Sequence, residues 1–101
     1  MSFRFDHLSG SAQIRLVGHF TGQSALDFLP VVRRTLPDYA NHPLVINMAE
    51  VERIDTIGMG AMLVLHRDAQ RQSTALHVKN CKQTVRDVFR IANLDKPFHF
   101  D

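Results

Sequence analysis

The chain has 101 residues, of which 45% are hydrophobic, and its 12 Lys and Arg exceed its 10 Asp and Glu by only two charges. A chain of this length can bury one core without disulfides or metals, so we expect a single domain over residues 1–101. One cysteine, scattered basic residues and the lack of a long apolar run argue against a disulfide framework, nucleic-acid binding, an export signal and membrane insertion. We therefore expect a cytoplasmic protein.

Two segments near the N-terminus have the spacing of β-strands. Apolar and polar residues alternate in Phe3–Phe5, and Ala12–Val17 gathers apolar residues with similar spacing. Between them, Leu8–Ser11 contains Ser and Gly, which are typical of turns. We expect the two strands to pair as a hairpin.

A helix is predicted after this hairpin. Ser24 and Asp27 resemble a capping box, with the acid one methylene shorter than the usual Glu. Pro30 would remove a hydrogen bond inside that helix, so we expect either a kink or a helix that begins near Pro30. Pro37 is expected to end it. The predicted buried face consists of Ala25, Phe28, Leu29, Val32 and Leu36.

The remaining elements alternate between strands and helices. Leu44–Met48 is continuously apolar apart from one Asn, as expected for a central strand that is covered on both faces. Such alternation predicts the α/β class, with helices packed on a mixed four- to five-stranded sheet. The other predicted elements are a helix from about Gly58 to Arg71, a strand at Leu76–Lys79, a helix from Gln83 to Ile91 or Ala92 that buries Val85, Val88, Phe89 and Ala92, and a short edge strand at Phe98–Phe100.

The junction between the central strand and the next helix carries Asp55, Thr56, Gly58 and Gly60. Either Asp55 or Thr56 can act as the helix N-cap, and the glycines keep the neighbouring surface low. A helix N-terminus also favours added negative charge by about 0.3–2 kcal/mol, so a phosphate there would not unfold the domain. It would instead disturb an apolar partner contact. Local chemistry alone also allows Thr56 to be a simple cap.

The helix after Thr56 is apolar on more than one side. At 100° per residue, Ala61, Met62, Leu65 and Ala69 face the sheet. The residues predicted to point outward are Met59, Leu63 and Val64 together with Arg67, Gln70 and Arg71. An outward Met and Leu beside arginines would form a docking surface for a partner. The alternative is that another helix or the loop at residues 18–22 covers Met59 and Leu63.

Other chemistries lack their usual patterns. The six histidines show no His-x-x-x-His spacing, the chain has no Gly-x-Ser-x-Gly elbow, and Gly58-x-Gly60 is too short for a nucleotide-binding loop. We therefore expect neither catalysis nor a metal site or cofactor.

Two motifs resemble the STAS domain family, which includes the anti-sigma factor antagonists. The first is a strand, then Asp-Ser/Thr-x-Gly-x-Gly, then a helix, and it corresponds here to VINMAEVERIDTIGMGAMLVLHRDAQRQ at residues 45–72. The second is an amphipathic helix followed by Leu-Asp-Lys and an aromatic segment, and it corresponds to VRDVFRIANLDKPFHFD at residues 85–101. Together with the order of elements, the resemblance covers nearly the whole chain and implies the STAS sandwich fold.

The resemblance also implies a mechanism of partner switching. In such regulators the unmodified domain binds a GHKL-type anti-sigma factor or serine/threonine kinase, the kinase phosphorylates the hydroxyl of the motif, and a PP2C-type phosphatase reverses the modification. The corresponding acceptor is Thr56, flanked by a partner-binding set of Asp55, Ile57, Gly58, Met59, Gly60, Leu63 and Arg67.

Three features differ from the usual antagonist pattern. The acceptor is Thr rather than Ser, Ile57 occupies a position where a small residue is common, and Gly18–Gly22 lacks the two acids that are frequent in that loop. STAS domains with Thr at the acceptor position also occur as accessory subunits of ABC-type lipid transporters, which need no phosphorylation. The resemblance therefore implies this scaffold role as the alternative function.

Overall fold

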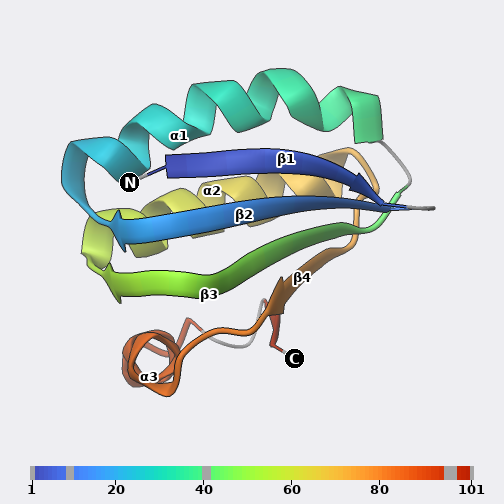
Figure 1. Ribbon diagram of the computed structural model, residues 1–101. Coiled ribbons are helices and arrows are strands. Elements are labelled where there is room, and N and C mark those ends of the chain that lie inside the picture. Colours follow the sequence, from blue (N-terminus) through green and yellow to red (C-terminus); the bar gives the residue numbers. More distant parts are fainter. Residues whose placement is uncertain (1, 9–10, 40–41, 95–97, 101) are drawn as a thin grey trace.

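The computed structural model describes residues 2–8, 11–39, 42–94 and 98–100, which form a mixed sheet with helices (Figure 1). The expected α/β class is confirmed. Within the described residues, no helix has the length and apolar character needed to span a membrane. The strands are β1 (Ser2–Leu8), β2 (Ser11–Phe20), β3 (Leu44–Ile54), β4 (Leu76–Lys79) and β5 (His99–Phe100), and the helices are α1 (Gly22–Thr35), the 3-10 helix η1 (Leu36–Tyr39), α2 (Thr56–Arg71) and α3 (Gln83–Ile91).

The five strands lie in the sheet in the same order as in the chain. β1 pairs antiparallel with β2, with Phe3 opposite Leu16, which confirms the predicted hairpin, although its tip at residues 9–10 lies outside the described residues. β2, β3, β4 and β5 run parallel to one another. A helix connects each parallel strand to the next, as parallel pairing requires.

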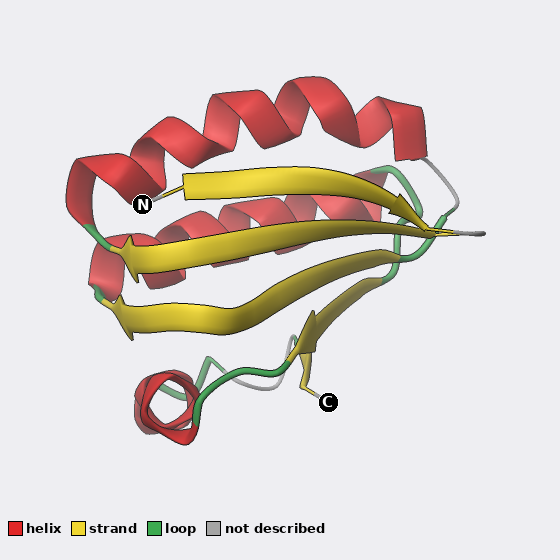
Figure 2. Ribbon diagram, viewed as in Figure 1, coloured by secondary structure: helices red, strands yellow, loops and turns green. Residues whose placement is uncertain are grey.

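α1 and α2 lie side by side against one face of the sheet, whereas α3 lies near the carboxyl end of β3, beyond the short β4 (Figure 2). The aromatic ring of Phe28 links α1 to the sheet, because it makes edge-on contacts with Phe3 at 5.1 Å and with Phe20 at 5.4 Å between ring centroids. Such aromatic pairs add to the stabilisation from apolar burial. The two long helices are therefore fixed on the sheet by their buried faces.

The start of α1 differs from the prediction. The helix begins at Gly22 with Thr21 as N-cap, not at Ser24, and no side chain caps it. The Ser24 hydroxyl instead donates to the Thr21 carbonyl at 2.6 Å, and Asp27 accepts from Gln23 at 2.8 Å. The capping-box prediction was wrong because the chain enters the helix one turn earlier, directly from the end of β2.

Pro30 lies inside α1, which is one helix over Gly22–Thr35, so the expected alternative of a helix that begins near Pro30 was wrong. Pro30 is exposed, and so is Leu26 one turn earlier, whose carbonyl loses its partner. This side of the helix faces water, which can solvate that carbonyl. The predicted buried residues Ala25, Phe28 and Val32 are confirmed.

Other boundaries also needed correction. β3 continues past the predicted Met48 to Ile54, where Val51 and Ile54 are buried after a register irregularity opposite β2. α3 buries Val85 and Phe89, but Ala92 lies beyond its end and is exposed. β5 contains only His99 and Phe100. The predicted Leu-Asp-Lys motif falls partly on residues 95–97, which lie outside the described residues.

Candidate functional site

The candidate site lies at the edge of the sheet where β2 and β3 end and α1 and α2 begin. Phe20 and Ile54, the last residues of these two parallel strands, are register partners. Both helices start within two residues of this pair, so their N-termini lie at the same edge of the domain (Figure 1). Exposed backbone N–H groups and the positive ends of two helix dipoles are thus brought to one surface.

Asp55 is the N-cap of α2, which decides between the two caps that the sequence allowed. Its Oδ1 accepts a hydrogen bond from the Gly58 N–H at 2.8 Å, and its Oδ2 accepts one from the Gly22 N–H at 3.1 Å. Both carboxylate oxygens are therefore engaged by the backbone at the starts of the two helices. This arrangement leaves no need for Thr56 to serve as a cap.

Thr56 is the first residue of α2, and its side chain is exposed. Its hydroxyl forms no hydrogen bond with any residue that the structure describes. Ile57 follows it with 42% of its surface exposed, and Leu26 in α1 is 44% exposed. Large apolar side chains with this exposure, near the starts of the two helices that begin at this edge, provide the components of a protein contact. We call Thr56, Ile57 and Leu26 the helix-start surface.

The two glycines of the motif have different environments. A Cβ on Gly58 would overlap the carbonyl oxygen of Phe20 and lie 2.9 Å from Ile54 Cγ1, so only glycine allows α2 to approach β2 this closely. A Cβ on Gly60 would meet nothing within 4 Å. Gly58 is therefore a packing residue, while Gly60 leaves a low point on the outer side of α2.

Met59 does not point outward as predicted, because it is only 6% exposed and belongs to the core. His66 is seven residues further along α2 and so lies on the same flank, where its ring contacts Phe98 at 5.5 Å. Phe98 in turn contacts Phe89 of α3. The C-terminal part of the chain therefore lies against this flank at His66. Because Met59 belongs to the core, the prediction that it points outward was wrong.

The outer side of α2 is formed by residues spaced three or four apart. Thr56, Gly60, Leu63 and Arg67 follow one stripe within about 60° around the helix axis. Arg67 is exposed, whereas Leu63 is half-buried and packs against the core, so Leu63 is only partly available to a partner. The predicted docking surface is thus less apolar than the sequence indicated.

Outside this region, few groups have unusual chemistry. Burial raises the pKa of the Cys81 thiol to about 11, a change that Arg86 partly offsets. A thiol with that pKa stays protonated and unreactive at neutral pH. Among the described residues, no three His, Cys, Asp or Glu side chains gather closely enough to hold a metal ion.

Comparison with known proteins identifies relatives of this arrangement. A family model described as "Mlab, STAS domain" matches residues 3–99. The unphosphorylated form of the anti-sigma factor antagonist SpoIIAA is similar with a TM-score of 0.81 and 19% identity, over 99% of this chain and 88% of that one. A putative anti-sigma factor antagonist from Thermotoga maritima gives a TM-score of 0.86 and 16% identity, over 97% of this chain and 84% of that one.

The same fold also occurs within a much larger protein. The murine anion transporter Solute Carrier 26 family member A9 is similar with a TM-score of 0.80 and 16% identity, over 94% of this chain but only 16% of the transporter. At these identities the likeness shows a shared fold.

Proposed function

This chain belongs to the STAS domain family, and from that membership we propose that it is a regulatory binding protein of the anti-sigma factor antagonist type. Its unmodified form would bind a GHKL-type anti-sigma factor or serine/threonine kinase through the helix-start surface. Phosphorylation of Thr56 would release that partner, and a PP2C-type phosphatase would restore binding. The proposed setting is the cytoplasm, where ATP is available and Cys81 would stay reduced.

The observation that carries this proposal is the exposed Thr56 hydroxyl, which is not engaged as a helix cap. In the proposed step, Thr56 Oγ1 attacks the γ-phosphorus of ATP, ADP leaves, and the hydroxyl proton passes to a base. Both Asp55 oxygens already accept backbone hydrogen bonds, so the kinase would supply that base. Asp55 is accordingly a positioning residue for the acceptor.

The physical effect of the phosphate follows from its location. About two negative charges at the N-terminus of α2 are compatible with the helix dipole, so the fold would persist. Binding a partner over Ile57 and Leu26 would, however, require those charges to be desolvated, which is costly. Modification would thus abolish the contact while leaving the domain folded.

A second candidate function is favoured by Ile57. This β-branched side chain directly follows the acceptor and is exposed, so it narrows access to Thr56 while offering a permanent apolar contact. These properties suit a non-phosphorylated accessory subunit of an ABC-type lipid transporter. In that role the domain would support the transporter ATPase constitutively.

Affinity capture from the native host with variant baits distinguishes the two functions. The switch predicts that wild-type and Thr56→Ala baits recover a GHKL kinase and that Thr56→Glu does not. Thr84→Glu provides a matched control, because Thr84 is also an exposed threonine in the first turn of a helix, α3. Recovery of a transporter ATPase by the wild-type bait, without any kinase, would establish the scaffold role instead.

A further inference from the structure

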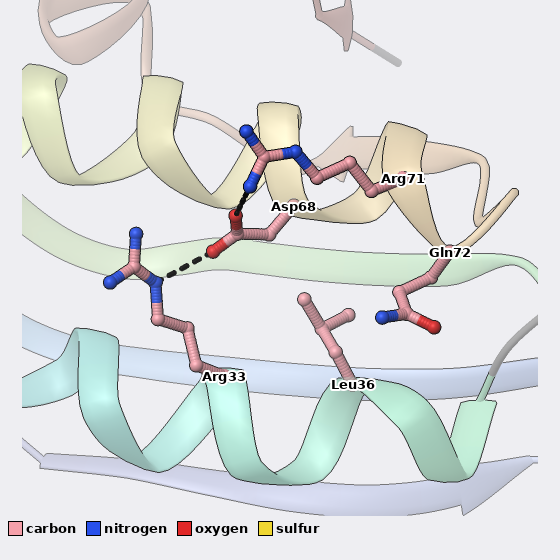
Figure 3. A pocket seen from close by; sticks show the side chains of 5 residues that line it. All are labelled: Arg33, Leu36, Asp68, Arg71 and Gln72. Carbon is pink, nitrogen blue, oxygen red and sulfur yellow. Dashed lines mark hydrogen bonds and ion pairs between the residues drawn. The ribbon is translucent and has the colours of Figure 1, made fainter.

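A cavity of about 350 Å³ opens between the C-terminal ends of α1 and α2, at the opposite end of these helices from Thr56. Figure 3 shows Arg33 from α1 and Arg71 from α2 pointing toward Asp68 from either side. Arg33 Nε donates to Asp68 Oδ2 at 2.7 Å, and Arg71 Nη1 lies 3.8 Å from Asp68 Oδ1. One carboxylate therefore holds two guanidinium groups at the cavity. The cavity is lined by these three side chains together with Leu36 and Gln72.

These guanidinium groups retain unused hydrogen-bond donors. A guanidinium has five N–H donors, but within the described residues Arg33 uses only its Nε, and Arg71 is too far from Asp68 for a hydrogen bond. Arg67, one turn before Arg71, is exposed and has no ion-pair partner among the described residues. Arg33 and Arg71 thus flank one carboxylate, and Arg67 adds a third cation one turn before Arg71, so these four side chains together carry two net positive charges. We call Arg33, Arg67 and Arg71 the arginine cluster.

We propose that the arginine cluster binds an acidic segment of a protein partner. Carboxylates of that segment would accept hydrogen bonds from the free terminal groups of Arg33 and Arg71 and would pair with Arg67. Guanidinium donors in a fixed fork suit carboxylates well, and Asp68 already orients Arg33 for this contact.

The positions of Arg67 and Thr56 on α2 predict how far apart the corresponding contacts on the partner should lie. This step rests on the proposed function. The two residues are eleven positions apart on the same stripe of α2, a distance of about 16 Å along the helix. A partner segment that covers Thr56 would therefore reach the arginine cluster with acidic residues about 16 Å further along. The same partner would meet an uncharged surface at one end and cations at the other.

A protein partner fits this surface better than an anionic membrane does. Leu36, the apolar residue of the cavity, is 2% exposed, and the exposed large hydrophobic residues of the described chain lie elsewhere. The cluster therefore has no apolar anchor to insert into lipid, and three cations alone would bind a membrane only weakly.

Nuclear magnetic resonance titration of the full chain with a hexaglutamate peptide tests the proposal. At roughly 0.1 M ionic strength, where the Debye length of about 10 Å limits the effect of distant charges, we expect the resonances of Arg33, Arg67 and Arg71 to shift together, and we expect the effect to vanish at about 1 M. Arg67→Gln and Arg71→Gln should each weaken binding about two- to fivefold. Arg53→Gln, which removes the same charge from an exposed position near the end of β3, should leave the affinity unchanged.

Several outcomes would overturn the inference. If Arg53→Gln weakened hexaglutamate binding equally, or if the resonance shifts were centred on Arg4 and Arg15 of the sheet, the peptide would be binding non-specifically to positive charge. Arginine-dependent binding to phosphatidylglycerol vesicles without binding to hexaglutamate would assign the cluster to lipid. Thr56→Glu should not alter the hexaglutamate affinity, because Thr56 is about 16 Å from Arg67. The hexaglutamate titration therefore tests the arginine cluster independently of the proposed phosphorylation of Thr56.

Discussion

The Asp55 carboxylate accepts a hydrogen bond from the Gly22 N–H at 3.1 Å, across 33 residues of the chain. Because the same carboxylate caps α2 through Gly58, one side chain joins the starts of α1 and α2. Gly22 has φ of +52°, a conformation that glycine adopts without strain. A single acidic residue beside the proposed phosphorylation site therefore ties the two helix N-termini together, in addition to the packing of their buried faces.

Replacement of Asp55 should cost far more stability than replacement of its neighbour Thr56. Asp55→Ala removes an N-cap bond and a second bond to α1, so we expect a loss of about 2 kcal/mol in the free energy of unfolding. Thr56→Ala removes an exposed side chain and should change stability by less than about 0.5 kcal/mol. Urea unfolding of both variants measures the difference, and equal losses would contradict the assignment of the cap.

The two glycines of the motif should respond in opposite directions to alanine. Gly58→Ala forces a methyl group against the Phe20 carbonyl and should destabilise the domain by about 1–3 kcal/mol or more. Gly60→Ala meets open space and should stabilise α2 by about 0.5–1 kcal/mol, because glycine is a poor helix former. Denaturant unfolding tests both, and a stabilising Gly58→Ala would contradict the close approach of α2 to β2.

Partner binding should depend on Ile57 more than on other exposed apolar residues. Ile57→Ala removes part of the helix-start surface, and we expect the affinity for the partner recovered by the wild-type bait to fall about tenfold. Ile91→Ala is the matched control, since Ile91 is 80% exposed at the end of α3. Calorimetric titration provides the measurement. If Ile91→Ala weakens binding as much as Ile57→Ala, the contact lies on another surface.

Stability should fall in alkaline solution because of Cys81. Burial raises the pKa of this thiol from 9.0 to about 11, so between these values the unfolded chain releases a proton that the folded chain retains. The contribution of Cys81 to folding is thus fully present below pH 9 and declines as the pH rises toward 11. Comparison of the wild type with Cys81→Ala across this window isolates the effect from other groups. A stability difference that stays constant with pH would contradict it.

Much of the fold follows from patterns that the sequence displays directly. The hairpin at Phe3–Val17, the strand at Leu76–Lys79 and the core face of α2 all follow from apolar periodicity, and the structure confirms each. The start of α1 could not be found in this way, because Ser24 has the local chemistry of a cap but the path of β2 decides where the helix begins.

The site was only partly predictable for a similar reason. Local sequence places Asp55 and Thr56 at a helix start, and both can cap, so only the geometry selects Asp55. The bond from Gly22 to Asp55 joins residues far apart in the chain and has no local signal. Met59 was misplaced because helical periodicity gives the angle of a residue around the axis, not which neighbours pack against that flank.

Intact-mass spectrometry of the protein purified from its native host, with fragmentation to locate the modification, tests whether Thr56 is a reversible phosphorylation site that controls partner binding. We predict a fraction heavier by about 80 Da, the mass of one phosphoryl group, with the phosphate on Thr56. A protein that remains unmodified under all growth conditions, and that co-purifies with a transporter ATPase, would contradict the switch and support the constitutive scaffold.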